Sequence, residues 1–175
     1  AKPVIVDVNP NYWCLDPNNL REVISSRTKA IIPVHLYGHP CDMDIITEIA
    51  ERYGLYIIED AAEAHGAEYK SRKVGSLGHI ACFSFYGNKI ITTGEGGMCL
   101  TNDEELAEKM KILRDHGMDP EKRYWHVTIG FNYRMTNLQA ALGVAQLSKI
   151  EKFIEKKRRL AKIYAEELSS IDGIT

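Results

Sequence analysis

One lysine in an uncharged stretch is the residue of this chain most able to do chemistry. Lys89 is the only formally charged residue between Ile80 and Thr93. Among apolar neighbours a lysine favours its neutral amine, because burial penalises the charged form. A neutral lysine amine forms a Schiff base with an aldehyde. A surface lysine whose charged end reaches water is the plain structural alternative.

A carboxylate stands where it could act with that amine. Asp60 follows a short apolar stretch at residues 55–59, and Lys89 follows another at residues 81–86. Ligands of parallel α/β sheets bind at the carboxyl ends of the strands. Pyridoxal phosphate needs a Schiff-base lysine and a carboxylate that keeps its pyridine nitrogen protonated. The pair therefore favours a pyridoxal phosphate site, although Asp60 alone could equally cap a helix.

Three glycines follow Lys89, and we interpret them as a structural turn. Gly94, Gly96 and Gly97 allow close backbone approach. Their spacing fits neither of the two common phosphate-loop patterns, so the glycines alone do not indicate a nucleotide site.

Histidine, cysteine and aspartate gather in residues 35–44, which raises the alternative of a zinc site. Their spacing matches no standard ligand pattern. A strand end, a Gly-His-Pro turn and a helix cap at Asp42 or Asp44 explain the same residues. A metal hydrolase is a further alternative, and its ligands would be His35, His39, Asp60 and His65.

Short apolar stretches alternate with helical patterns along the chain. This alternation predicts an α/β fold with a mainly parallel sheet and helices on both faces. Strands are expected at residues 1–8, 30–36, 55–60, 81–86 and 97–101. Helices are expected from the Asp16-Pro17 cap, over residues 43–53 up to Gly54, from a capping box at residues 101–104 up to Gly117, and over residues 137–169.

Two segments stand apart from this alternation. Residues 118–136 are rich in aromatic residues and arginine and lack periodicity, and long loops of this kind are usually functional. A basic run at residues 156–159 lies on the last helical pattern. We interpret it as a solvated helix face rather than as an anion site.

Composition excludes several classes of protein. With 22 basic and 24 acidic residues the formal net charge is −2, so no global basic field attracts nucleic acid or a membrane surface. The apolar runs are too short to span a bilayer. The four cysteines are widely spaced without a Cys-x-x-Cys pair, which predicts reduced thiols in a cytoplasmic protein.

Several motifs in order resemble the DegT-type nucleotide-sugar aminotransferases, and within that family the perosamine-synthesising branch. The motifs are IEDAAEAHGA at residues 58–67, FSFYGNK at 83–89, TGEGG at 93–97, RYWH at 123–126 and GFNYRMTNLQAA at 130–141. The resemblance covers essentially the whole chain. It implies a pyridoxal phosphate-dependent fold of the aspartate aminotransferase (type I) kind, of which this chain is an incomplete large domain.

The resemblance also implies a role for individual residues. Lys89 is the Schiff-base lysine and the base that moves a proton, and Asp60 pairs with the pyridinium nitrogen. Ser84 binds the cofactor phosphate. Glu63 lies near the phenolic oxygen, where many relatives have Gln. Asn132 reaches the phosphate of the neighbouring subunit, which makes a homodimer part of the site.

The resemblance also implies contacts beside the cofactor and in the aromatic-rich segment at residues 118–136, here called the aromatic loop. Ala61 or Ala62 packs near the cofactor. The substrate-facing candidates are Arg123, Tyr124, Trp125 and His126. A loop held only by aromatic packing remains the alternative for these four residues.

The implied reaction moves the amino group of glutamate to a nucleotide-linked 4-keto-6-deoxy sugar, with GDP favoured, for polysaccharide synthesis. Residues 1–136 are expected to be the cofactor-binding part of the large domain. Residues 137–175 form a helix leading towards a small domain outside the chain, and an upstream phosphate-binding turn is also expected outside it. The alternatives are a different nucleotide sugar, or a truncated, non-catalytic binding module of the same fold.

Overall fold

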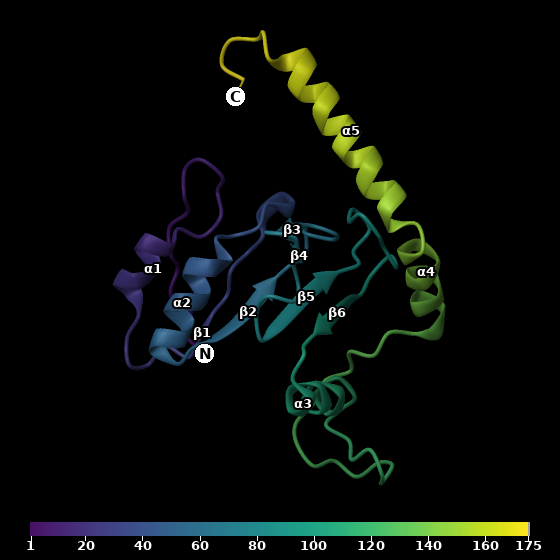
Figure 1. Cartoon of the computed structure of the whole chain (residues 1–175). Coiled ribbons are helices and arrows are strands. Elements are labelled where there is room, and N and C mark those ends of the chain that lie inside the picture. The colour runs from purple at the N-terminus through teal and green to yellow at the C-terminus, as the bar shows by residue number, and fades with distance from the viewer. Residues whose placement is uncertain (175) are drawn as a thin grey trace.

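The main sheet is mostly parallel. The computed structural model describes residues 1–174 (Figure 1). Within them the sheet has the strand order β1-β2-β5-β6. The strands are β1 (Ala30–Ile31), β2 (Tyr56–Asp60), β5 (Ile80–Ser84) and β6 (Gly97–Leu100). The pairs β1–β2 and β2–β5 are parallel and β5–β6 is antiparallel, so the predicted α/β fold with a mainly parallel sheet is confirmed. A separate hairpin joins β3 (Glu68–Tyr69) to β4 (Arg72–Lys73).

Helix ends follow the predicted caps over the first half of the chain. The helices are α1 (Pro17–Val23), α2 (Met43–Tyr53), α3 (Glu104–Arg114), α4 (Asn137–Leu147) and α5 (Ile150–Leu168), with a 3-10 turn at Leu36–Gly38. Asp16 caps α1 and accepts a hydrogen bond from the Asn18 amide. Asp42 caps α2, which ends at Gly54 in a left-handed conformation with φ 62° that suits glycine.

The main core lies between α2 and the first two strands. Figure 1 shows α2 alongside β1 and β2, with α1 beside it. Ile46 and Ile49 of α2 are buried in one cluster with Ile31 of β1 and Ile57 of β2. The strand β6 is exposed along its whole length, so the helices expected on both faces of the sheet cover β6 least.

The predicted strand at residues 1–8 is wrong. Val4 is 63% exposed and Ile5 is 86% exposed, and Val8 makes only a single bridge to Leu15. A strand needs a partner along its length, and here the chain turns back after Val8 instead. The strand expected at residues 30–36 is also shorter, because Pro33 has no amide hydrogen to donate to a ladder.

The start of α3 differs from the expected capping box. Asp103 is the cap and accepts from the Leu106 amide at 3.0 Å. Thr101 instead donates its hydroxyl to the His79 carbonyl at 2.6 Å. The helix ends at Arg114 rather than running up to Gly117.

The helix expected over residues 137–169 is divided into α4 and α5. Ser148 and Lys149 separate the two helices. The Ser148 hydroxyl donates to the Ala145 carbonyl at 2.9 Å, a local bond that competes with helix continuation. α5 extends away from the sheet in Figure 1. Among the described helices, none is long and apolar enough to cross a membrane.

Candidate active site

Two polar side chains mark neighbouring strand ends. Asp60 is the last residue of β2 and Ser84 is the last residue of β5. These strands are parallel, and Asp60 pairs in register with Cys82. Their carboxyl ends therefore meet at one edge of the sheet, where ligands of this fold class bind.

Lys89 and Glu63 come together beyond that edge. Lys89 Nζ lies 3.6 Å from Glu63 Oε1, and the lysine side chain is only 16% exposed. Glu63 Oε2 accepts a hydrogen bond from the Tyr37 amide at 2.9 Å. The carboxylate is thus held on one oxygen while its other oxygen faces the amine.

The remaining bonds leave donors and acceptors available to a ligand. Asp60 Oδ1 accepts from the Ala62 amide at 3.1 Å, and Asp60 Oδ2 has no donor within residues 1–174. Ser84 Oγ accepts from the Tyr86 amide at 3.2 Å, which leaves the hydroxyl proton to donate. An amine, a carboxylate and a hydroxyl donor match the aldehyde, pyridine nitrogen and phosphate of pyridoxal phosphate.

Helix α4 anchors the segment after Lys89, a contact that no local pattern in the sequence predicts. The Thr92 amide donates to Gln146 Oε1 at 3.1 Å, and Gln146 Nε2 donates to the Thr92 carbonyl at 2.9 Å. Gln139 Nε2 likewise donates to the Glu95 carbonyl at 3.1 Å. Gln146 therefore holds both backbone groups of Thr92, which lies three residues beyond Lys89.

We expect Gln146→Leu to loosen this segment. The variant loses both hydrogen bonds to Thr92, each worth about 0.5–1.5 kcal/mol. Amide exchange over residues 90–94 should therefore be about tenfold faster, measured by hydrogen–deuterium exchange. Lys152→Leu, at an exposed position of α5, should leave exchange there unchanged. Unchanged exchange at Thr92 in Gln146→Leu would show that the hydrogen bonds of Gln146 do not hold residues 90–94.

The aromatic loop lies elsewhere in the chain. In Figure 1 the loop that follows α3 is far from the carboxyl ends of β2 and β5. Lys122 Nζ lies 4.2 Å from the ring centroid of Trp125, and His126 Nδ1 lies 2.9 Å from the His116 carbonyl oxygen. Tyr124 is 71% exposed, and Asn132 bridges to Asp115 next to the end of α3. Within one chain the structure does not bring these residues together with Lys89.

The proposed metal ligands are dispersed. His35 pairs with Glu59 at 3.1 Å, the His39 ring lies 5.2 Å from the Tyr12 ring, and the His65 ring lies 5.3 Å from the Phe83 ring. Over residues 1–174, no three His, Cys, Asp or Glu side chains are grouped so that they could hold a metal ion. Within these residues the geometry therefore supports neither the zinc alternative nor the metal-hydrolase alternative.

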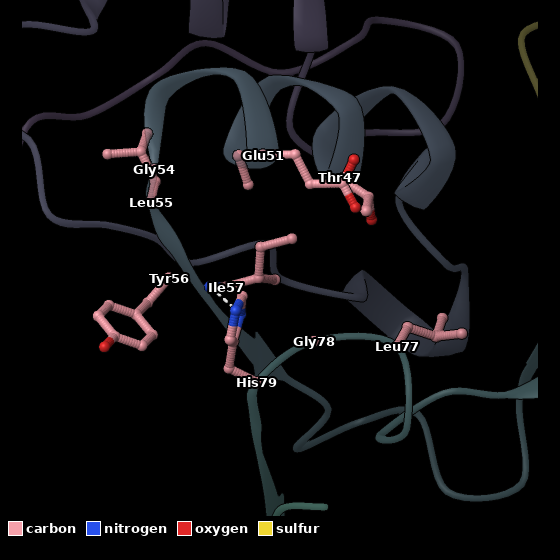
Figure 2. A pocket seen from close by; sticks show the side chains of 10 residues that line it. Thr47, Glu51, Gly54, Leu55, Tyr56, Ile57, Leu77, Gly78 and His79 are labelled. Atoms are coloured by element: carbon pink, nitrogen blue, oxygen red, sulfur yellow. Dashed lines mark hydrogen bonds between the residues drawn. The ribbon is translucent and has the colours of Figure 1, made fainter. Parts of the chain in front are cut away.

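A cavity of about 530 Å³ lies at the other end of the sheet. It is lined by residues of α2 and by residues 55–57 and 77–79, at the amino ends of β2 and β5. Figure 2 shows the His79 ring beside Ile57, whose amide donates to His79 Nδ1 at 3.0 Å. This cavity is separate from the edge that carries Asp60 and Ser84.

Comparisons with known proteins agree with this geometry. The model of the DegT/DnrJ/EryC1/StrS aminotransferase family matches residues 1–175. GDP-perosamine synthase of Caulobacter vibrioides is 56% identical over 98% of this chain and 46% of that protein. GDP-perosamine synthase of Escherichia coli O157:H7 is 47% identical over 98% of this chain and 47% of that protein. The solved aminotransferase from Psychrobacter cryohalolentis is 43% identical with a TM-score of 0.90, covering 97% of this chain and 46% of that one. The chain thus spans about half the length of these relatives.

Proposed function

The chain belongs to the DegT/DnrJ/EryC1/StrS aminotransferase family, and we propose that the whole protein is a pyridoxal phosphate-dependent transaminase of nucleotide-linked sugars. The observation that carries this proposal is the position of Asp60 and Ser84 at neighbouring strand ends, together with the contact of Lys89 with Glu63 in the segments that follow them, in a chain of this family. An amine alone would suit many roles. An amine with a carboxylate and a hydroxyl donor at the same edge suits this cofactor.

The proposed substrates are glutamate and a GDP-linked 4-keto-6-deoxy sugar, which receives the amino group at the keto carbon. The two relatives named GDP-perosamine synthase support this choice of nucleotide sugar. The product would be a 4-amino sugar for polysaccharide synthesis. We place the enzyme in the cytoplasm on the cysteine pattern, which is typical of a reducing compartment.

Each residue at the edge has a distinct proposed task. Pyridoxal phosphate, when bound, supplies an aldehyde and an electron-accepting ring. Lys89 would hold the cofactor at its aldehyde, and its amine would carry a proton as general base and acid. Asp60 holds a proton on the pyridine nitrogen, and Ser84 donates its hydroxyl to the phosphate. Glu63, whose Oε1 lies 3.6 Å from Lys89 Nζ and whose Oε2 accepts from the Tyr37 amide, would lie near the phenolic oxygen of the cofactor.

The proposed assembly is a homodimer in which each copy completes the site of the other. Asn132 is exposed and bridges to Asp115 next to the end of α3, where it could reach the phosphate of a second copy. Exposed apolar side chains surround it in sequence, among them Ile129 at 87% and Leu138 at 85%. Exposed apolar side chains near Asn132 in sequence support a contact of this segment with another protein surface.

The remaining proposals concern contacts of the cofactor and substrate and the division of the chain into domains. Ala62, next to Asp60, packs near the cofactor, and the substrate contacts come from the aromatic loop, namely Tyr124, Trp125 and His126. Residues 1–136 form the cofactor-binding part of the large domain. Residues 137–175 lead towards a small domain, in keeping with the way α5 leaves the sheet in Figure 1.

The test is turnover by the whole protein. We expect glutamate, pyridoxal phosphate and a GDP-linked 4-keto-6-deoxy sugar to give 2-oxoglutarate and an amino sugar in equal amounts, measured by mass spectrometry. A dTDP-linked keto sugar serves as the comparison substrate. Faster turnover of the dTDP-linked sugar would overturn the choice of GDP. A dimer that forms no specific cofactor adduct would instead favour the non-catalytic binding module.

A further inference from the structure

Two cysteines face each other across β5 and β6. Cys82 and Cys99 are paired in the antiparallel register, and their sulfur atoms are 3.9 Å apart. Directly opposite residues in such a pair have Cα atoms about 4.5–5.5 Å apart. A disulfide spans Cα separations of about 4.4–6.8 Å, with sulfur atoms about 2.0 Å apart. The two thiols can therefore be joined by side-chain rotation, without movement of the strands.

The two thiols are not equivalent. Cys99 is exposed, whereas Cys82 is partly buried. The contact between the two thiols lowers the pKa of Cys99 and raises the pKa of Cys82, which burial raises further. The thiolate is the reactive form of cysteine. Cys99 is thus suited to attack a reagent, and Cys82 is suited to attack Cys99 afterwards.

The other two cysteines provide an internal comparison. Cys14 and Cys41 are 1% and 0% exposed. Their thiols donate to the carbonyl oxygens of His39 and Val34, each at 3.2 Å. Burial, together with the neighbouring Cys14, raises the pKa of Cys41 to about 12. Both thiols are buried, whereas Cys99 is exposed, and a buried structural thiol is inert.

We propose that Cys82 and Cys99 form a redox-active dithiol, a modification site that small-molecule disulfides such as glutathione disulfide convert into a cross-strand disulfide. The Cys99 thiolate attacks one sulfur of the small disulfide, whose S–S bond breaks and releases one thiolate that takes up a proton. Cys82 then loses its proton and attacks the Cys99 sulfur, which expels the second small thiol. Two protein thiols are oxidised and one small disulfide is reduced to two thiols.

The position of this bond links it to the candidate active site. Cys82 is the register partner of Asp60 on β2, and it lies two residues before Ser84. Ser84 itself pairs with Gly97 of β6. The disulfide would tie β5 to β6 two residues before Ser84 and beside Asp60 of β2. The chemistry of the thiol pair does not depend on the proposed transaminase activity.

The test is a map of thiols in the whole protein. The reduced protein is exposed to glutathione disulfide, alkylated, digested without reductant and analysed by mass spectrometry. We expect a peptide that joins Cys82 to Cys99 and disappears with dithiothreitol. Cys82→Ser should instead leave glutathione on Cys99, because the second step is lost. Cys14→Ser, the matched control, should keep the Cys82–Cys99 cross-link.

Three results would overturn the proposal. The first is lasting glutathione on Cys99 of the unaltered protein with no cross-linked peptide. The second is oxidation of Cys14 and Cys41 at the same rate as that of Cys82 and Cys99. The third is a disulfide between two copies through Cys99. The unaltered protein alone decides all three, so the proposal stays testable if a variant fails to fold.

Discussion

Lys89→Ala is expected to abolish covalent capture of pyridoxal phosphate by the whole protein and to lower transamination by at least about 10²-fold. The variant removes the amine that holds the aldehyde and moves the proton. Glu63 and Ser84 cannot replace it, because a carboxylate and a hydroxyl form no Schiff base. Tyr37 still donates to Glu63, so the surrounding structure should remain intact.

Borohydride reduction measures this effect directly. The unaltered protein should retain one pyridoxyl group per chain, located at Lys89 by peptide mapping. Lys73→Ala is the matched control, because this exposed lysine pairs with Glu68 at 2.7 Å away from the strand ends. Labels spread over several lysines, or a label that persists in Lys89→Ala, would show that Lys89 is not the attachment point.

The sequence predicted the features that local rules control. The alternation of apolar stretches with helical patterns predicts the parallel strands, and the strand ends predict Asp60 and the segment after residues 81–86 at one edge. Ser84 is expected only from the family resemblance. The Asp16 and Asp42 caps and the Gly54 end depend on residues a few positions away. Each of these features has its cause within one turn or one strand of the chain.

Features caused by distant residues could not be predicted in this way. Gln146 contacts Thr92, which lies 54 positions away, and an isolated glutamine in a helical pattern carries no sign of its partner. Residues 1–8 are apolar enough for a strand, yet only the presence of a neighbouring strand decides whether they form one. The break at Ser148 competes with helix continuation by a single side-chain bond.

Glu59 is the most consequential residue that sequence reasoning missed. It precedes Asp60, but its side chain is fully buried. Its two oxygens accept hydrogen bonds from three backbone amides within residues 75–78 at 2.6–2.8 Å, and from His35 Nε2 at 3.1 Å. His35 Nδ1 accepts from the Cys41 amide, so the ring proton lies on Nε2 and is donated to Glu59. The Glu59 carboxylate thus connects β2 to His35 and to residues 75–78, directly before Asp60.

Glu59→Gln is expected to lower the free energy of unfolding by about 1–3 kcal/mol, the usual cost of leaving a buried hydrogen-bond donor without its partner. Glutamine offers a single carbonyl oxygen to four donors, and its own amide group would face amide hydrogens. Urea unfolding measures the change. Glu68→Gln, at an exposed carboxylate paired with Lys73, should leave the unfolding midpoint nearly unchanged. An equal loss of unfolding free energy in both variants would mean that the burial of Glu59 does not add to the stability of the fold.

The pH dependence of this difference gives a second, independent check. Burial raises the pKa of Glu59, but the hydrogen bonds from His35 and the three amides outweigh it, so the pKa is lowered. A folded-state pKa below the unfolded value, about 4.3, means that the ionised carboxylate stabilises the fold above that pH. This contribution is lost as the pH falls through the folded-state pKa. The stability gap between the unaltered protein and Glu59→Gln should therefore be constant near neutrality and narrow below about pH 4. A gap that stays constant through that acidic range would mean that the charge of Glu59 does not stabilise the fold.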